Sequence, residues 1–247
     1  MTRFLHLAPE AVDGDRVVFD AAAAHHLGRV LRAAAGDVVQ AVDGGGALLS
    51  VRLTAVTGRR AEGLIVGRAP LATESPLHLT LAQAIPKGDK MDGIIRMATE
   101  LGVTRVVPLL TARTLVRLEP VRWGSRVGRW QRIAKEAAQQ SGRAAVPEIT
   151  PPRELSAWSP EAEAAGLLIC LWEEERAGLD KRLPPGPRPR VTVVVGPEGG
   201  LTPEEARGLA GAGALVAGLG PRLLRTETAG PVAVALLQSR YGDLGTA

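Results

Sequence analysis

Two turns rich in glycine and proline are the stretches of this chain best suited to hold a ligand. The apolar run Val191–Val195 breaks into the turn Gly196–Gly200, GPEGG, and a second run at 214–219 breaks into the segment Leu219–Ala229, LGPRLLRTETA. An unbroken β-branched run is typical of a strand covered on both faces of a parallel sheet. Because the carboxyl ends of parallel strands meet at one edge of the sheet, where α/β proteins bind ligands, the two turns predict a binding site.

Each turn leads into a helix, but neither carries a known phosphate-binding signature. Residues Thr202–Glu205 predict a capping box with Pro203 at the first helical position, and a last helix is expected at about Thr228–Tyr241, with Pro231 in its first turn. The Gly-Lys-Ser/Thr of a P-loop does not follow, and no G-x-G-x-x-G comes after a strand. Ordinary strand–helix turns without a ligand are the competing interpretation, and spacing alone leaves both open.

Composition limits the classes of protein to which the chain can belong. Its 247 residues carry 30 Lys and Arg against 26 Asp and Glu, a net charge of +4, which is a mild bias toward polyanionic partners. The one cysteine, Cys170, lies in an apolar run, which excludes a disulfide framework and predicts a buried thiol. No metal site is expected, because the adjacent His25 and His26 do not share a helix face. Without a signal sequence or a membrane-spanning run, we expect a cytoplasmic protein.

The pattern of apolar runs changes near residue 72 and predicts two domains. In residues 1–71, short strands are expected at 3–7, 16–20, 37–43, 47–57 and 62–68, with a helix at about 21–32. A small β-barrel is the natural closure of such strands. After the linker at 72–76, strands at 77–85, 105–110 and 166–172 alternate with helices at about 89–101 and 122–140, so residues 77–247 predict an α/β domain. The proline-rich stretch Arg176–Arg190 predicts a long loop, which is often functional.

Arginines form a second group of candidate residues. In the helix expected at 122–140, an apolar face contains Trp123, Val127, Trp130, Ala134 and Ala137, and an adjacent face contains Arg122, Arg126 and Arg129. In an RNA-binding protein such a stripe would contact phosphates, and so would arginines of the barrel, among them Arg3, Arg29 and Arg32. A solvated surface without a partner is the alternative for both groups.

Several motifs, in one order along the chain, resemble a known family. They are HHLGRVLR at 25–32, PKGDKMD at 86–92, TELGVT at 99–104, WQRIAKE at 130–136, QSGR at 140–143, VPEI at 146–149, and the two turns GPEGGLTPEE and LGPRLLRTETA. Together they resemble the RsmE family of 16S ribosomal RNA (uracil-N3)-methyltransferases, of the SPOUT class, over essentially the whole chain. The resemblance implies a parallel-sheet α/β methyltransferase domain with a deep trefoil knot, preceded by a small PUA-like β-barrel that binds RNA.

The resemblance also implies S-adenosyl-L-methionine as cofactor, 16S ribosomal RNA of the small ribosomal subunit as partner, a homodimer, and no metal. The cofactor would lie among three strand ends, with backbone groups reading its polar edges and leucines covering its adenine. The residues implied to bind it are Leu171, Trp172, Glu173, Val195, Gly196, Pro197, Glu198, Gly199, Leu219, Gly220, Pro221, Leu224, Arg225 and Thr226.

Transfer to uracil N3 requires that its proton be removed, and no side chain need form a covalent intermediate. Glu227 and Glu198 are the candidate proton acceptors, and Arg225 is the candidate for holding a phosphate or a uracil oxygen. Alternatives remain open: Glu198 could instead accept backbone N–H bonds within its turn, and Arg225 could form an ion pair with either carboxylate. The expected RNA contacts are Arg3, Arg29, Arg32, Arg122, Arg126, Arg129, Gln139 and Arg143, the last two reaching the site from a second subunit.

Two other functions remain compatible with the sequence. One is a non-catalytic RNA-binding or ribosome-assembly factor, against which the two intact turns argue. The other is a SPOUT methyltransferase that acts on transfer RNA, a possibility that the barrel-first domain order disfavours. Binding of S-adenosyl-L-methionine separates the first alternative from a methyltransferase, and the modified nucleoside separates the second.

Overall fold

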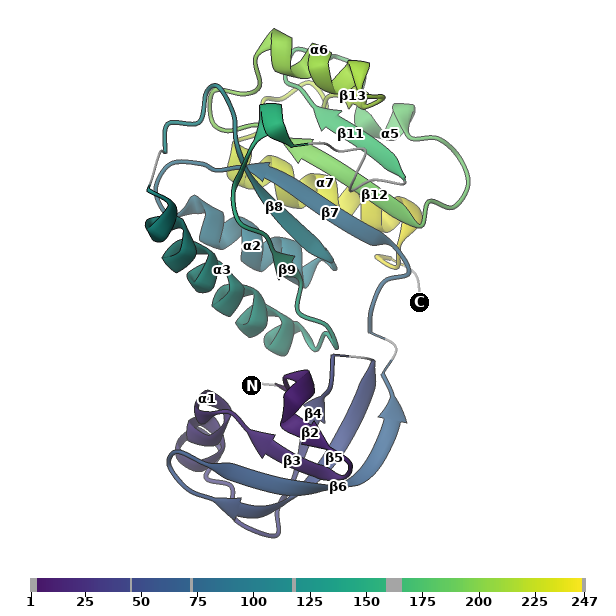
Figure 1. Ribbon diagram of the computed structural model, residues 1–247. Coiled ribbons are helices and arrows are strands. Elements are labelled where there is room, and N and C mark those ends of the chain that lie inside the picture. Colours follow the sequence, from purple (N-terminus) through teal and green to yellow (C-terminus); the bar gives the residue numbers. More distant parts are fainter. Residues whose placement is uncertain (1–3, 45, 72, 117–118, 159–165, 246–247) are drawn as a thin grey trace. The chain divides into compact units, whose positions relative to one another are not determined.

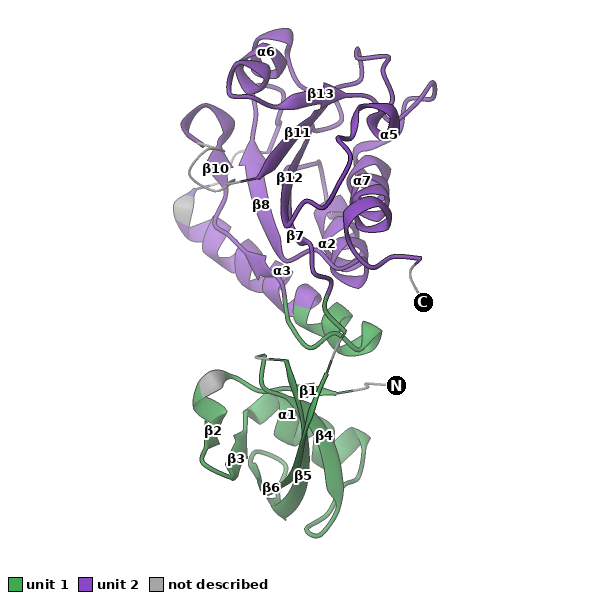
Figure 2. Cartoon of the chain, turned by 90° about the vertical axis from the view of Figure 1, so that its right-hand side faces the viewer, with its two compact units in different colours: residues 1–74, 135–146 green, residues 75–134, 147–247 purple. Residues whose placement is uncertain are grey.

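The computed structural model describes residues 4–44, 46–71, 73–116, 119–158 and 166–245 (Figure 1). The predicted RNA contact Arg3 lies outside these residues. Contacts within the chain divide it into two compact units: unit 1 holds residues 1–74 and 135–146, and unit 2 holds residues 75–134 and 147–247 (Figure 2).

Unit 1 is built on a curled, six-stranded sheet. Its strands are β1 Leu5–His6, β2 Val12–Asp13, β3 Arg16–Phe19, β4 Val38–Val42, β5 Ala47–Val56 and β6 Ala61–Pro70. They lie in the order β1-β4-β5-β6-β3-β2, and all neighbours are antiparallel except β1 and β4. Two register shifts interrupt the long β5–β6 pair, and irregularities of this kind bend a sheet. The sheet therefore curls as the predicted small barrel requires.

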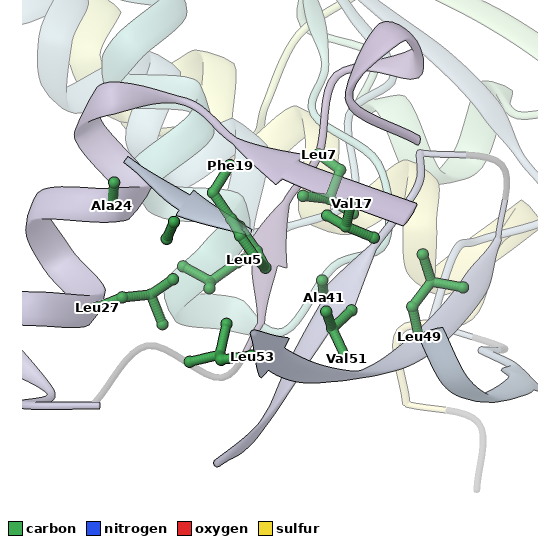
Figure 3. Packing of buried hydrophobic residues seen from close by; sticks show 11 residues of the cluster. Leu5, Leu7, Val17, Phe19, Ala24, Leu27, Ala41, Leu49, Val51 and Leu53 are labelled. Atoms are coloured by element: carbon green, nitrogen blue, oxygen red, sulfur yellow. The ribbon is translucent and has the colours of Figure 1, made fainter. Parts of the chain in front are cut away.

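The concave side of this sheet encloses a core of aliphatic side chains and one phenylalanine. Leu49, Val51 and Leu53 alternate along β5 and are at most 1% exposed, and Phe19 and Leu27 pack with them (Figure 3). The alternation follows from the two-residue period of a strand, which sends every second side chain inward. Gly63 on β6 belongs to the same packing, because a Cβ there would lie 2.5 Å from Val51 Cγ1.

The helix expected at 21–32 is shorter and less regular than predicted. Helix α1 spans Ala21–His25 and begins at Asp20, whose side chain accepts a hydrogen bond from the Ala23 backbone N–H. It continues as the wider turn η2, His26–Val30, and the chain then leaves at Arg32 with a φ of 54°. A short 3-10 turn, η1, precedes β2 at Pro9–Ala11.

The end of helix α3, Pro120–Ser141, and the residues after it complete unit 1. Arg143 is only 5% exposed, and its Nη2 lies 2.6 Å from Glu74 Oε2. The Glu74 carboxylate also accepts the backbone N–H groups of Ala144 and Ala145, at 2.8 and 3.1 Å. His6 Nε2 lies 2.9 Å from the Arg143 carbonyl, and burial holds the pKa of His6 below its ordinary value. A predicted RNA contact, Arg143, is therefore part of a buried structural cluster.

Unit 2 is organised around a parallel sheet. Its strands are β7 His78–Ala84, β8 Arg105–Leu110, β9 Glu148–Ile149, β10 Arg153–Glu154, β11 Leu167–Leu171, β12 Arg190–Val195 and β13 Leu215–Ala217. They lie in the order β10-β8-β7-β12-β11-β13, with β9 also paired to β8, and all pairs are parallel. The predicted α/β fold with buried strands is thereby confirmed.

Helices cover both faces of this sheet. Helices α2, Lys90–Glu100, and α7, Thr226–Tyr241, contact each other, and α7 also contacts β7 and β12 (Figure 1). Helix α6, Pro203–Gly211, and the 3-10 turn η3, Leu155–Ala157, pack with a core cluster on the other face. Cys170 belongs to that cluster, and burial raises the pKa of its thiol to about 12, so the predicted inert thiol is confirmed.

Two local predictions for unit 2 need correction. The last helix begins at Thr226 rather than Thr228, so Pro231 lies inside it instead of in the first turn. The proline-rich stretch is not a plain loop, because it contains the short helix α5, Leu179–Arg182, and Gly178 forms a β-bridge with Gly218. Small residues at the bridge allow this approach: a Cβ on Gly218 would lie 2.2 Å from a backbone oxygen. The trefoil knot stays a prediction.

The core of unit 1 predicts a large difference between two leucines on its paired strands. Leu53→Ala removes a buried side chain and should lower the free energy of unfolding by about 2–5 kcal/mol, because it leaves a cavity. Leu64→Ala, at a position 49% exposed, is the matched control and should cost about 0.5 kcal/mol or less. Urea unfolding followed by circular dichroism measures both changes. Equal losses would contradict the assignment of Leu53 to the core.

Candidate functional site

The carboxyl ends of three neighbouring strands meet at one edge of the unit 2 sheet. Leu171, the last residue of β11, pairs in register with Val195 of β12 on one side and with Ala217 of β13 on the other. On its far side, Val195 pairs with Gln83 of β7. The segments that follow these strands therefore begin side by side, as the sequence predicts for the two turns.

A buried hydroxyl joins the start of α7 to two of these strand ends. Thr226 Oγ1 donates to the carbonyl oxygen of Gly196 at 2.7 Å and accepts from Gln83 Nε2 at 3.0 Å. Gln83 is fully buried, and its Nε2 also donates to the Ala84 carbonyl. Gly230 makes room for this amide, because a Cβ there would lie 2.7 Å from Gln83 Oε1. The network fixes where the turn after β12 meets the first turn of α7.

Glycines in the turn after β12 are required by close contacts. A Cβ on Gly196 would lie 2.9 Å from the backbone carbon of Gly200, across the turn. Gly200 has a φ of 70°, and its Cα faces the Glu173 carboxylate so closely that a Cβ would lie 1.6 Å from Glu173 Oε1. The turn closes with a 2.9 Å hydrogen bond from the Gly200 N–H to the Pro197 carbonyl. Substitution at either glycine would therefore disrupt the turn.

The helix after this turn begins as predicted, and a residue from another strand supports it. Thr202 and Glu205 form a reciprocal capping box at the start of α6, which confirms the prediction. Arg113, which follows β8, donates from Nη1 to the Gly199 carbonyl at 2.6 Å. Glu205 Oε1 in turn accepts the backbone N–H of Ala112 at 2.8 Å. No pattern around Arg113 in the sequence indicates this contact.

Lys90, at the start of α2, lies between the two acidic candidates. Its Nζ is 3.0 Å from Glu198 Oε1 and 3.4 Å from Glu227 Oε2. Glu198 Oε1 also accepts the backbone N–H of Lys87 at 3.0 Å. The ammonium therefore bridges the turn after β12 and the first turn of α7. Lys90 belongs to the family-like segment 86–92, but nothing in that segment indicates its carboxylate partners.

Electrostatics distinguish the two carboxylates. Partial burial acts to raise the pKa of Glu198, but hydrogen bonds from the Lys90 side chain and from backbone N–H groups outweigh it, so that pKa lies below its ordinary value. Glu198 thus has the turn-stabilising contacts of its alternative interpretation. Glu227 is 26% exposed, and its Oε2 is shielded from solvent without a hydrogen bond.

Arg225 is the most open of the charged candidates. Its side chain is 85% exposed, and its Nη1 lies 4.0 Å from Glu227 Oε1, at the outer limit of an ion pair. An exposed pair at this distance contributes little to stability. The guanidinium is therefore available to a bound molecule, and its competing role as a structural ion-pair partner is weak in this geometry.

The remaining cofactor candidates differ in how accessible they are. Gly220 has a φ of 104° with open space where a Cβ would lie. Leu223, three residues later, is 82% exposed. Leu219 and Leu224 are half-buried, and Pro221 is exposed. Leu171 and Val195 are buried in the sheet, so they offer only their backbone. Trp172 packs against the core cluster beneath α6, and its indole Nε1 is buried without a hydrogen-bond partner.

The predicted RNA contacts fall into two groups. Arg29, Arg32 and Arg122 are exposed, Arg126 and Gln139 are half-buried, and Arg129 is exposed but forms an ion pair with Asp92. Arg143 is held by Glu74 in the buried cluster of unit 1 and does not face solvent. We therefore withdraw Arg143 from the set of side chains that can reach an RNA phosphate.

Two kinds of feature are absent from the described residues. Within them, no group of three or more His, Cys, Asp or Glu side chains is placed to hold a metal ion. None of the helices in the described part of the chain combines the length and the apolar character needed to cross a membrane.

Comparison with known families identifies both units. Residues 73–238 match the model of an RNA methyltransferase domain, and residues 19–66 match the model of an RNA methyltransferase PUA domain, which confirms the predicted PUA-like fold. The ribosomal RNA small subunit methyltransferase E of Synechocystis is 36% identical over 95% of this chain and 77% of that protein. The protein of the same name from Bacillus subtilis is 32% identical over 83% of this chain and 82% of its own length.

Solved structures agree with these matches. A ribosomal RNA small subunit methyltransferase E from Neisseria gonorrhoeae, bound to S-adenosyl methionine, is 33% identical with a TM-score of 0.84 over 98% of this chain and 99% of that one. A Legionella pneumophila protein described as a methyltransferase, in complex with the same cofactor, is 32% identical with a TM-score of 0.89, over 99% of this chain and all of the other.

The Lys90 bridge predicts a measurable change in the titration of its partner. In Lys90→Met, the pKa of Glu198 should rise toward its ordinary value, because a hydrogen bond that lowers it is lost. Carbon-13 shifts of the carboxyl groups, followed over pH, measure it. The matched control is Lys87→Met, which keeps the backbone N–H that contacts Glu198.

The same substitution should change the pH dependence of stability. The lowered pKa of Glu198 means that its carboxylate stabilises the fold above its unfolded-state pKa, and that this contribution is lost as pH falls through the folded-state pKa. Lys90→Met should therefore lose less stability on acidification than the wild type. An unchanged Glu198 pKa in this variant would show that the bridge does not exist in solution.

Proposed function

We propose that this chain, which belongs to the ribosomal RNA small subunit methyltransferase E family, transfers a methyl group from S-adenosyl-L-methionine to N3 of one uridine in 16S ribosomal RNA. The proposal rests on one observation: the ends of β11, β12 and β13 lie side by side. The exposed Arg225 guanidinium and the carboxylates of Glu198 and Glu227 lie beside the glycine-rich turns there. A binding scaffold has no need of such an arrangement.

The residues at this edge fit the cofactor chemically. Adenosine needs apolar cover and backbone groups for its polar edges, and the segment 218–225 offers half-buried Leu219 and Leu224 beside the open space at Gly220. The Trp172 indole N–H is an orphaned donor at the end of β11. Leu219, Gly220, Leu224 and the turn 196–199 would hold the cofactor, whose sulfonium supplies an activated methyl group.

The chain's own contribution to the chemistry is positioning and control of charge. Holding two reacting groups in line can lower a barrier by up to about 7–11 kcal/mol. Arg225, exposed at the same edge, would grip a phosphate or an oxygen of the uracil ring, where negative charge develops as the N3 proton is lost.

Glu227 is the better candidate for accepting that proton. Glu198 already accepts hydrogen bonds from Lys87 and Lys90, and its lowered pKa makes it a weak base. Glu227 stands two residues from Arg225, and its Oε2 has only the longer 3.4 Å ion pair with Lys90 and no hydrogen bond. A proton acceptor and an anion-stabilising group would thus approach the base from one turn of α7.

We also propose that the protein has two domains, at 1–71 and 77–247, with a trefoil knot in the second, and that it is located in the cytoplasm. It would act as a homodimer. Helix α7 supports the dimer, since Leu236 is 39% exposed and Val232 and Ala235 are half-buried, leaving an apolar strip on the helix. Gln139 could then reach the site of the other subunit. Light scattering at working concentration tests the dimer, and a monomer with full activity would refute it.

Nucleoside mass spectrometry tests the proposed reaction. The purified chain, given S-adenosyl-L-methionine and small ribosomal subunits from a strain that lacks the enzyme, should form 3-methyluridine in 16S ribosomal RNA. Naked 16S ribosomal RNA and transfer RNA serve as comparison substrates. A chain that binds RNA but shows no heat of binding with S-adenosyl-L-methionine would instead be an assembly factor.

Arg225→Gln tests the role of the exposed guanidinium. Loss of one group that stabilises developing charge typically lowers kcat by about 10²–10³, and we expect a loss of this size with cofactor affinity unchanged. Methylation rates and calorimetric titration measure the two quantities. Arg222→Gln is the control, because Arg222 is an exposed arginine of the same segment. Undiminished methylation by Arg225→Gln would remove Arg225 from the reaction.

A further inference from the structure

The opposite edge of the unit 2 sheet carries a basic feature that the proposed reaction does not use. The segment between β11 and β12 contains four prolines and ends in Arg188 and Arg190, at the amino-terminal start of β12. Tyr241, the last residue of α7, donates from its hydroxyl to the Pro184 carbonyl at 2.7 Å and anchors this segment. The feature is therefore a fixed part of the fold.

A hollow lies where this segment meets the start of β11. It has a volume of about 400 Å³ and is lined by Gly166, Leu167, Pro184, Arg188, Pro189 and Arg190. Pro187 and Pro189 flank Arg188 in the chain, and their fixed φ angles limit the conformations that the segment can adopt. The backbone that carries Arg188 is thus restricted before any ligand arrives, which lowers the entropy cost of binding.

Both arginines lack a carboxylate partner among the described residues, which sets them apart from their neighbours. Arg182 in the same segment pairs with Glu175, and Arg105 at the same edge of the sheet pairs with Glu148. Arg188 Nε is shielded from solvent and has no hydrogen-bond acceptor. A buried charged donor without a partner is unfavourable, so an anion in the hollow would relieve this cost.

A neighbouring histidine reports the same positive field. His78, the first residue of β7, pairs in register with Arg190, and its backbone N–H donates to the Pro189 carbonyl. Burial, followed by the charges of Arg190 and Arg105, holds the pKa of His78 below its ordinary value. Positive charge from Arg190 thus reaches His78 beside the hollow.

We propose that this hollow binds a backbone phosphate of the RNA strand that flanks the modified uridine. Guanidinium groups bind phosphate through paired hydrogen bonds, and two unpaired arginines on a stiff segment provide such a site. Strand β12 runs five residue steps from Arg190 to the candidate active edge, or about 17 Å, so the phosphate belongs to a nucleotide a few positions from the target. The identity of the anion as RNA rests on the proposed function.

The test compares charge-removing variants at equal net charge. The double variant Arg188→Gln with Arg190→Gln should weaken binding of a labelled 16S ribosomal RNA fragment by a similar factor for every RNA sequence. The slope of the logarithm of the association constant against the logarithm of the salt concentration should become shallower by about one per lost phosphate contact. Fluorescence anisotropy at several salt concentrations measures both. Arg96→Gln with Arg207→Gln is the control, since both arginines are exposed and neither lines the hollow or the candidate active edge.

Two further measurements make the outcome decisive. In the double variant, the affinity for S-adenosyl-L-methionine measured by calorimetry should match the wild type, because the hollow lies at the other edge of the sheet, and the thermal midpoint should not fall. The Nε–H resonance of Arg188 should shift with RNA at micromolar concentration and not with inorganic phosphate at the same concentration. Equal shifts with both ligands would overturn the RNA assignment in favour of a small-anion site.

Failure of this proposal differs from failure of the proposed function. If the double variant keeps the affinity and the salt slope of its control, the phosphate site is refuted even when methylation is normal. If the wild type binds RNA through these arginines but forms no 3-methyluridine, the site is supported and the methyltransferase proposal fails.

Discussion

The candidate site depends on one buried hydroxyl, that of Thr226, which links the Gly196 carbonyl to the Gln83 amide. A carbonyl at the end of a parallel strand has lost its ladder partner and must find another donor, or bear the cost of burial without one. Thr226 supplies that donor from the first residue of α7. The turn after β12 and the start of α7 therefore have one relative position, and these two segments carry Glu198, Arg225 and Glu227.

Charge at this edge is distributed so that Arg225, among the candidate site residues, stays open to solvent. Lys90 forms ion pairs with Glu198 and Glu227, and Arg113 donates hydrogen bonds to backbone carbonyls of the glycine turn. Arg225 instead extends into solvent. Lys90 and Arg113 stabilise the site, because each joins two segments that would otherwise separate or repel. The exposed guanidinium of Arg225 is available to a negatively charged substrate, whereas Lys90 and Arg113 are engaged within the fold.

Sequence patterns predicted the parts of this arrangement that local physics controls. The β-branched run at Val191–Val195, the capping box at Thr202 and the glycine turn all follow from periodicity and backbone geometry, and the structure confirms them. Contacts between segments far apart in the chain could not be predicted: Lys90 reaches Glu198 across 108 positions, and Arg143 pairs with Glu74 across 69. A charged side chain looks the same in sequence whether it meets a carboxylate or water, and the expectation for Arg143 failed for this reason.

Two residues of α7, Pro231 and Gly230, are unfavourable inside a helix but affect its contacts at the site. Pro231 has no N–H for the carbonyl of Glu227, four residues earlier, so the first turn of the helix is less tightly bonded where Glu227 stands. Gly230 exposes the helix backbone so that Gln83 can approach, and any larger residue would displace that amide. Alanine at position 230 would favour the helix by itself, but its Cβ would lie 2.7 Å from Gln83 Oε1 and would push this amide away from Thr226. The glycine is thus the condition under which the strand edge and the helix share one site.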